Sequence, residues 1–395
     1  MGPRPEATWG RDGNGAGSPK TRSVPGMHTV EVDLGERSYP IHIGSGLLGR
    51  ETLIAGCLPG TRALVVSDEA VARLYLAPLR RGLRGVETAE LVLPRGEGSK
   101  SLATAARIMD ALAAHRCQRD SAVIALGGGV VGDLAGFAAA CFHRGIAWLQ
   151  VPTTLLAQVD ASVGGKTGVN HAGVKNLIGA FHQPLAVVAD TDTLSTLDAR
   201  ELRAGLAEVI KHGVILDPDF FAWLEDNVGR LLDRDPDALA RAIRRSCEIK
   251  AAVVAGDERE CDRRALLNLG HSFGHAIESV SGFGEWLHGE AVAAGIAMAA
   301  RMSRAMGLLD APGCERILAL LAAAGLPAGA PGLDPGRLRT AMAADKKRRG
   351  ARLRLVLIDA IGAARVTAEF PDALLAETLA QSTAAGRDAS AGAGT

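Results

Sequence analysis

Two histidines, an asparagine and a glutamate share one short segment of an alanine-rich, apolar part of the chain. In NLGHSFGHAIES, Asn268 is followed by His271, His275 and Glu278 after three, seven and ten residues. This spacing places all four side chains on roughly one face if the segment is a single helix. Imidazole and carboxylate groups are ligands that zinc and similar divalent cations accept. The segment therefore contains candidate metal ligands, although an isolated His-xxx-His pair is often only a structural pair.

Two further helical patterns carry side chains of the same chemistry. His288 stands just before an apolar helix in WLHGEAVAAG, and Glu208 precedes Lys211 by three residues on one helical face in GLAEVIKHG. Buried glutamate and lysine side chains are rare without partners. In a strongly apolar helical region, this set is harder to explain as a structural pair. It predicts a divalent metal site that leaves one position open for a substrate.

A glycine-rich turn lies between a predicted buried strand and a helix in ALGGGVVGDLAGFAAA, residues 125–140. Glycine lets the backbone approach a pyrophosphate closely, and the following helix N-terminus favours negative charge. The spacing differs from GxGxxG, so a tight turn without a ligand is an alternative on this motif alone. Two other features favour a dinucleotide. Asp68 directly follows an early strand, where a carboxylate could bind ribose hydroxyls, and Thr153 and Thr154 follow another strand.

Cationic residues gather around a long glycine-rich loop between residues 158 and 184. The charged and amide side chains of the loop and of the segments around it are Arg144, Asp160, Lys166, Lys175, Asn176, Lys250, Arg264, Lys346 and Lys347. Ammonium and guanidinium groups together suit a ligand that carries a phosphate and a carboxylate. Taken singly, each cation could instead be a solvated surface charge. A loop of this length with little apolar pattern is usually functional or disordered.

Alternating strand and helix patterns must position the glycine turn. Short, apolar, β-rich runs, typical of strands buried on both faces of a parallel sheet, occur at residues 63–68, 89–94, 121–129, 147–154 and 185–190. Helix-length stretches such as residues 102–116 separate them. We therefore expect an α/β, Rossmann-like, NAD-binding domain over residues 28–193.

Helical patterns dominate the rest of the chain and must position the histidines. We expect a mostly α-helical, metal- and substrate-binding C-terminal domain over residues 194–383, with one strand or hairpin at residues 352–362. A ligand site is expected in the cleft between the two unlike domains. The tails, residues 1–27 and 384–395, have the composition of disordered segments, and Met27 could be the true start.

Charge and cysteine content narrow the class of protein. The 395 residues balance 44 basic against 44 acidic side chains, which leaves no electrostatic footprint for nucleic acid or an anionic membrane. Six scattered cysteines without a CxxC pair fit a reducing, cytoplasmic setting. No apolar run is long enough to span a bilayer, and the N-terminus lacks the apolar stretch of a secretory signal. We expect a cytoplasmic protein with a small-molecule ligand and with neither nucleic-acid nor membrane partners.

Several long motifs resemble the 3-dehydroquinate synthase family of the shikimate pathway. They are ALGGGVVGDLAGFAAA, VPTTLLAQVDASVGGKTGVN, KNLIGAFHQP, ELRAGLAEVIKHG, LLNLGHSFGHAIES and WLHGEAVAAG, and the resemblance covers roughly residues 30–380. It implies conversion of 3-deoxy-D-arabino-heptulosonate 7-phosphate to 3-dehydroquinate and phosphate. It further implies NAD and a divalent metal, zinc or cobalt, as cofactors, a phosphorylated sugar acid as substrate, and a homodimer.

The resemblance also implies roles for residues at matching positions. Glu208, His271 and His288 match the metal ligands, and His275 matches an imidazole that assists proton transfer. Substrate and phosphate contacts match Asp160, Lys166, Asn176, Lys211, Lys250, Arg264 and Asn268. The neighbouring subunit would supply Arg144, and either Lys347 or Lys346 would be a further contact. With Asp68 and Lys175 from the patterns above, the expected cofactor contacts are Glu97, Lys100, Gly128, Gly129, Val130, Val131, Gly132, Asp133, Thr153, Thr154, Lys166, Thr193, Leu194, Ser195 and Thr196.

The departures from the family pattern are small. His182 and His212 stand where the family commonly has tyrosine, and HAGVKN replaces a proline-containing loop. A metal-dependent polyol dehydrogenase would share the architecture but would not need the cationic set. A related sugar-phosphate cyclase would change residues around the carboxylate and phosphate sites, whereas Asn268 and His275 keep the synthase pattern. A non-catalytic NAD-sensing protein would not need an intact set of metal ligands.

Overall fold

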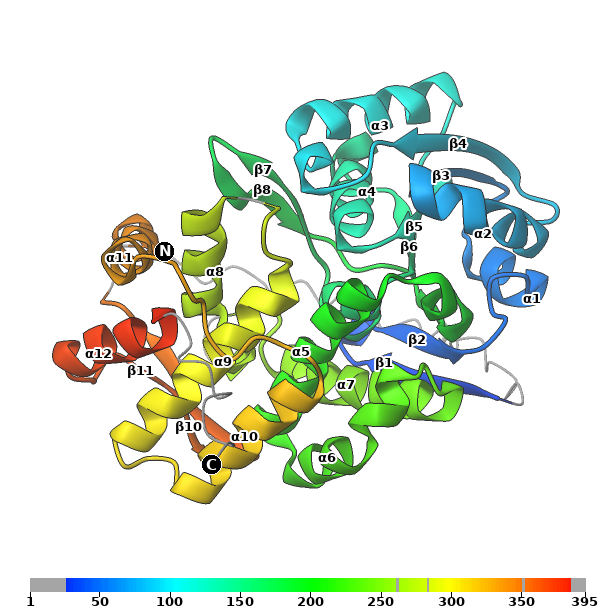
Figure 1. Ribbon diagram of the computed structural model, residues 1–395. Helices are drawn as coiled ribbons and strands as arrows, with labels where there is room; N and C mark the ends of the chain where they lie inside the picture. Colours follow the sequence, from blue (N-terminus) through cyan, green and yellow to red (C-terminus); the bar gives the residue numbers. More distant parts are fainter. Residues whose placement is uncertain (1–25, 261–262, 283, 350–351, 385–395) are drawn as a thin grey trace, which may run out of the picture.

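The computed structural model describes residues 26–260, 263–282, 284–349 and 352–384. A seven-stranded sheet with the strand order β1-β2-β9-β6-β5-β3-β4 organises the N-terminal part (Figure 1). Its strands are β1 (Met27–Val32), β2 (Tyr39–Gly44), β3 (Arg62–Asp68), β4 (Glu87–Leu93), β5 (Ala122–Gly127), β6 (Ala147–Pro152) and β9 (Val187–Asp190). Strand β1 is antiparallel to β2, and the other neighbours are parallel. The five strands predicted from apolar runs are confirmed.

Helices cover both faces of the sheet, which explains why its strands read as continuous apolar runs. Alternate residues of β3 face opposite sides, as the two-residue period of a strand requires. Leu64 and Val66 pack in one apolar cluster with α3 (Leu102–Ala114) and α4 (Gly129–Cys141). Ala63 and Val65 pack in another with α1 (Glu51–Ile54) and α2 (Glu69–Gly82).

The C-terminal part is mostly helical, as predicted. Its helices are α5 (Ala199–Leu216), α6 (Pro218–Leu232), α7 (Pro236–Gly256), α8 (His271–Ser281), α9 (His288–Ala305), α10 (Ala311–Ala323), α11 (Pro335–Arg349) and α12 (Asp372–Thr383). Strands β10 (Leu355–Ala360) and β11 (Ala363–Thr367) form the hairpin expected near residues 352–362.

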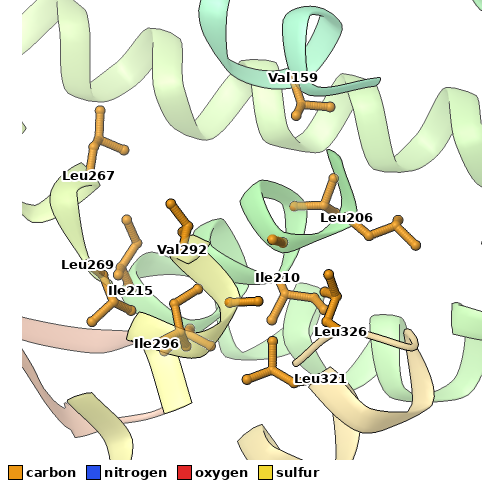
Figure 2. Close-up of a cluster of buried hydrophobic side chains, with 14 of the residues drawn as sticks. Val159, Leu206, Ile210, Ile215, Leu267, Leu269, Val292, Ile296, Leu321 and Leu326 are labelled. Atoms are coloured by element: carbon orange, nitrogen blue, oxygen red, sulfur yellow. The ribbon is translucent and has the colours of Figure 1, made fainter. Parts of the chain in front are cut away.

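A large apolar core holds these helices together, and Figure 2 shows part of it. Leu206 and Ile210 of α5 belong to this core together with Val292 and Ile296 of α9. Helix α9 is rich in small buried residues, so α5 and α8 can approach it closely. This close packing brings the N-terminal end of α9 to the middle of α5 and to α8.

Residues 166–181 of the glycine-rich segment predicted as a loop at residues 158–184 instead form an antiparallel hairpin of β7 (Lys166–His171) and β8 (Val174–Phe181). The strands approach so closely that a Cβ atom at Gly179 would lie 2.2 Å from the carbonyl oxygen of Thr167. Glycine is therefore required there, and the apolar alternation of an ordinary strand is missing. Only a few side chains, Val169 among them, bury themselves against α4, so the sequence carries a weak strand signal.

The proposed boundary between the two domains, near residue 193, falls in a 3-10 helix (Thr191–Thr196) between β9 and α5. The domain limits themselves stay a prediction. Within the described residues, no helix combines the length and the apolar character needed to cross a membrane.

Candidate active site

A cavity of about 1380 Å³ lies at the carboxyl ends of β3, β5 and β6 and extends to α5 and to helices that follow it. Ligands of parallel α/β sheets bind at this edge. Most predicted site residues line the cavity: Asp68, Glu97, Lys100, Gly128, Gly129, Val130, Val131, Asp133, Thr153, Thr154, Asp160, Lys166, Lys175, Asn176, Thr193, Thr196, Lys211, Lys250, Arg264, Asn268, His271, His275 and His288. Residues far apart in the sequence therefore meet in one space.

The glycine turn ends β5 and begins α4 at the cavity wall. Gly128 is the N-cap residue of α4, so the first backbone N–H groups of a thirteen-residue helix face the cavity. Cβ atoms at Gly128 and Gly129 would lie 3.2 Å from Thr154 and 3.3 Å from Ala161. The helix N-terminus and the tight approach of the backbone suit an anionic group such as a pyrophosphate. Gly132 lies outside the cavity lining, where it lets α4 pack against Gln150 of β6.

Two carboxylates and a buried lysine stand beside this turn. Asp68 Oδ1 accepts hydrogen bonds from the backbone N–H groups of Ala70 and Val71, at 2.9 and 3.0 Å, which caps α2 and fixes the carboxylate at the cavity wall. The buried Lys100 ammonium contacts the Asp133 carboxylate. Burial raises the pKa of Asp133 above its usual value, although Lys100 opposes the shift.

The 3-10 helix after β9 contains four predicted cofactor contacts, of which two line the cavity and two do not. Thr193 and Thr196 line the cavity, and the Thr196 hydroxyl lies 2.5 Å from the hydroxyl of Tyr75. Leu194 is buried in the apolar core, and Ser195 is exposed, with its hydroxyl donating to the carbonyl of Asp192 at 2.7 Å. Tyr75 also lines the cavity and was missed in the sequence, where it reads as an ordinary residue of an amphipathic helix.

Glu208, His271 and His288 place one ligand atom each within 4.8 Å of one another. Glu208 Oε1 lies 3.8 Å from Nε2 of His271 and 3.8 Å from Nε2 of His288. The carboxylate is fully buried, and the buried ammonium of Lys211 forms an ion pair with it. A buried carboxylate that faces two imidazole nitrogens fits a divalent cation.

Burial and nearby charges shift the pKa values of the two imidazoles in opposite directions. Burial opposes protonation of His288, but Glu278 and Glu208 outweigh it and raise the pKa of that imidazole. Burial, together with the neighbouring Lys211, holds the pKa of His271 well below its usual range, so its imidazole is neutral. Glu278 lies 3.4 Å from Nδ1 of His288 and accepts a hydrogen bond from Lys175 at 2.7 Å. Glu278 is therefore placed to orient His288 from behind, as outer carboxylates do in metal sites.

The segment predicted as one continuous helix is broken between Asn268 and His271. Asn268 ends a 3-10 helix (Arg263–Asn268), and α8 begins only at His271. Gly270 has a φ of +80°, and a Cβ atom there would lie 2.6 Å from the carbonyl oxygen of Val292. The single-helix prediction is therefore wrong, because close contact with α9 forces a left-handed turn. Asn268 and the two histidines still reach the same cavity.

Lys166, Lys250 and Arg264 are predicted cations that line the cavity, and each contacts an oxygen of the chain. Lys250 Nζ donates to the carbonyl and to Oδ1 of Asp160, both at 2.6 Å. Burial opposes ionisation of Asp160, but Lys250 and Lys211 outweigh it and hold its pKa well below the usual value. Arg264 is almost fully buried and donates to the carbonyls of Glu258, at 2.5 Å, and Gly164, at 3.3 Å.

A carboxylate that sequence reasoning missed stands among these cations. Glu260 contacts the Lys166 ammonium and accepts a hydrogen bond from Nδ2 of Asn268 at 2.7 Å. Burial opposes its ionisation, but Lys166 and Asn268 outweigh it and lower its pKa. Glu260 also has a φ of +59°, which is uncommon for a residue other than glycine. Its segment shows no periodicity that would have singled it out.

Gly132, Leu194, Ser195 and Glu208 do not line the cavity, and Arg144 is a further predicted residue outside it. Arg144 is exposed at the end of a short 3-10 helix (Phe142–Arg144), outside the cavity lining. Lys347 belongs to α11, but its side chain lies outside the described residues, as does that of Lys346.

Comparisons with known proteins agree on one family. Two family models match, "3-dehydroquinate synthase N-terminal" over residues 90–204 and "3-dehydroquinate synthase C-terminal" over residues 205–348. The 3-dehydroquinate synthase of Nitrosococcus oceani is 57% identical over 358 residues, which are 90% of this chain and 100% of that protein.

Two solved structures of similar fold carry cofactors. One is 2-epi-5-epi-valiolone synthase from Streptomyces hygroscopicus with NAD+ and Zn2+ bound; it has a TM-score of 0.82 and 32% identity, covering 88% of this chain and 98% of that chain. The other is 2-deoxy-scyllo-inosose synthase complexed with carbaglucose-6-phosphate, NAD+ and Co2+, with a TM-score of 0.81 and 26% identity over 90% of this chain and 100% of that one.

Proposed function

The chain belongs to the 3-dehydroquinate synthase family, and we propose that its cavity converts 3-deoxy-D-arabino-heptulosonate 7-phosphate into 3-dehydroquinate and phosphate. The observation that carries the proposal is that a helix N-terminus, the two histidines of the Glu-His-His cluster and several cations line one cavity. The helix N-terminus suits a dinucleotide, the Glu-His-His cluster suits a divalent metal, and the cations suit a phosphorylated sugar acid.

NAD and a divalent metal are the cofactors, as the solved relatives with NAD+ and Zn2+ or Co2+ support. The turn at Gly128 and Gly129 would hold the pyrophosphate, and Asp68 would hold ribose hydroxyls. Glu208, His271 and His288 would hold the metal. When bound, the two cofactors supply reversible hydride transfer and a Lewis acid for substrate oxygens.

The chain's own residues bind and orient the substrate. Lys250, Lys166 and Arg264 face the cavity from three different elements, so they can surround a phosphate and a carboxylate on one ligand. His275 lines the cavity, and its ring centroid lies 5.5 Å from that of His271. It is placed to move a proton at a substrate hydroxyl, which is the role we propose for it. Positioning and electrostatics are the main contributions of such a site.

We further propose that the protein is a homodimer in which Arg144 completes the site of the partner. Arg144 is exposed and lies outside the cavity of its own chain. A Cβ atom at the adjacent Gly145 would lie 3.9 Å from His182, just after the end of β8. That strand exposes the apolar side chains of Leu177 and Phe181 to solvent. Exposed apolar side chains beside an arginine suit a protein interface.

The cellular setting is proposed to be the reducing cytoplasm. In the described part of the chain Cys57, Cys117, Cys141, Cys247 and Cys314 are free thiols, which supports this setting.

Phosphate release tests the proposed reaction. The zinc-loaded protein is mixed with the heptulosonate phosphate, with and without added NAD, and inorganic phosphate is measured. We expect release in step with substrate loss, and we expect removal of bound NAD to stop it. Lys250→Ala should release phosphate at least about 100-fold more slowly, since it removes a charge-assisted contact. The surface variant Glu225→Gln is the control. Absence of NAD-dependent phosphate release would refute the proposal.

A further inference from the structure

Asn170 joins residues that belong to the two proposed halves of the site, yet it lies outside the cavity lining. Its Nδ2 donates to Oε1 of Glu97 at 2.8 Å, and its Oδ1 accepts from the backbone N–H of Asn176 at 2.9 Å. Its own backbone N–H donates to the carbonyl of Lys100 at 2.9 Å. Glu97 and Lys100 are proposed cofactor contacts, and Asn176 is a proposed substrate contact.

The orientation of the Asn170 amide follows from its partners. The backbone N–H of Asn176 can only donate, and the Glu97 carboxylate accepts when ionised, so the Asn170 oxygen must face Asn176 and the nitrogen must face Glu97. The two hydrogen bonds run through one polar amide group and strengthen each other. Asn170 is half-buried, which limits competition from water at both bonds.

The two residues that the Asn170 side chain connects, Asn176 and Glu97, have distinctive backbone conformations. Asn176 has a φ of +52°, so its backbone occupies a region that residues other than glycine seldom adopt. Glu97 lies in a 3-10 helix (Glu97–Ser99) next to the cavity, connected to the hairpin by an isolated bridge between Ser101 and Asn170. A ligand that moves Glu97 must therefore move or break its bond to Asn170, and the backbone of Asn176 responds.

We propose that Asn170 is a positioning residue that couples NAD binding at Glu97 and Lys100 to anion binding at Asn176, an inference that rests on the proposed function. NAD binding fixes Glu97, Glu97 fixes the amide of Asn170, and the amide holds Asn176 in its left-handed conformation. Coupling between two sites is reciprocal, so substrate anions tighten NAD binding by the same factor. The site thereby favours the complex that holds cofactor and substrate together.

Calorimetric titration of zinc-loaded protein tests the coupling, with NAD as ligand and inorganic phosphate as the probe of the anion site. In the unmodified protein, saturating phosphate should tighten NAD binding on the order of 5-fold or more. Asn170→Ala removes both bonds and should reduce this ratio to about one. Asn170→Asp keeps the acceptor for Asn176 but sets a carboxylate against Glu97; it should lose the coupling while still binding phosphate alone with the affinity of the unmodified protein.

Controls separate coupling from a loss of structure. His171→Ala changes the adjacent exposed side chain of the same hairpin and should keep the full ratio. Amide hydrogen exchange at Asn176 gives a second readout: NAD should slow it in the unmodified protein and not in either Asn170 variant. A ratio near one in the unmodified protein, or an unchanged ratio in a folded Asn170→Ala protein, would overturn the inference. Absence of phosphate release from the heptulosonate phosphate would instead refute the proposed function.

Discussion

The Lys166 ammonium contacts the Glu260 carboxylate at the mouth of the cavity, where a substrate anion is proposed to bind. Glu260 is ionised at neutral pH, because Lys166 and Asn268 lower its pKa against the effect of burial. An incoming anion must therefore displace a carboxylate of the chain before it can pair with Lys166.

Glu260→Gln should tighten the binding of inorganic phosphate. The pair is partly exposed, so its strength is modest and the gain should be about 2- to 5-fold in Kd. Titration of phosphate into the metal-loaded protein measures it. Glu90→Gln breaks a comparable ion pair with Arg80 on the surface and is the matched control. Weaker phosphate binding by Glu260→Gln would show that this carboxylate instead holds Lys166 and Asn268 in their binding positions.

Chelation of the metal should abolish turnover, and zinc or cobalt should restore it. Glu208→Gln and His271→Ala should each lower the bound metal, measured by elemental analysis, and reduce activity roughly 100-fold or more, because a Lewis acid contributes several kcal/mol. Glu225→Gln changes a surface carboxylate paired with Arg316 and should retain the metal. Full activity in a preparation verified to be free of metal would contradict the assignment.

Stability should depend on pH through His212. This side chain is fully buried in α5, and neither ring nitrogen has a hydrogen-bond partner among the described residues. Burial, reinforced by Lys211, lowers its pKa from 6.5 to about 3. Between these two pH values the unfolded chain binds a proton that the folded chain does not. Stability is therefore fully present above pH 6.5 and falls as the pH falls toward 3.

Urea unfolding at several pH values measures this dependence. Over that window His212 should contribute a slope of up to about 1.4 kcal/mol per pH unit, and His212→Gln should remove this contribution. The same substitution at the exposed His28 is the control. If the free energy of unfolding depends on pH in the same way in the unmodified protein and in His212→Gln, His212 is not the cause of the dependence. A constant difference in stability between the two proteins would not change this conclusion.

Mixing two inactive variants tests the proposed role of Arg144 across a dimer interface. Arg144→Ala disables the site of the partner, and His271→Ala disables the site of its own chain. A mixed dimer would thus carry both defects in one site and neither in the other. After subunit exchange, each mixed dimer should have up to about half the activity of the unmodified dimer. Mass spectrometry shows whether the subunits have exchanged. If they have exchanged and activity does not return, the result counts against crossed sites.

Local sequence patterns predicted those parts of the site that depend on one element. The apolar run at β5 and the glycines after it specify a buried strand, a tight turn and a helix N-terminus, and the structure places them together. The histidine spacing within α8 likewise follows from helical periodicity.

Contacts between distant segments could not be predicted in this way. The break at Gly270 is caused by the backbone of Val292, which lies in another helix. Glu260 and Asn170 acquire their roles only because the hairpin folds against the segment after α7 and against Glu97. Their own neighbours in the sequence carry no signal for either contact, since polar residues outside a clear apolar pattern are usually solvated.

The last prediction concerns the balance of the cofactor. Conversion of the heptulosonate phosphate to 3-dehydroquinate and phosphate involves no net oxidation, so NAD must be regenerated in every turnover. Absorbance at the NADH band should therefore stay near its starting value over many turnovers while phosphate accumulates, apart from a small signal from enzyme-bound cofactor. The cavity supports this expectation because the glycine turn and the cations Lys166, Lys250 and Arg264 line one space, which can keep cofactor and substrate together until the cycle closes. A polyol dehydrogenase, in contrast, would form one NADH per substrate consumed. Stoichiometric growth of NADH without phosphate release would identify that activity and exclude the synthase reaction.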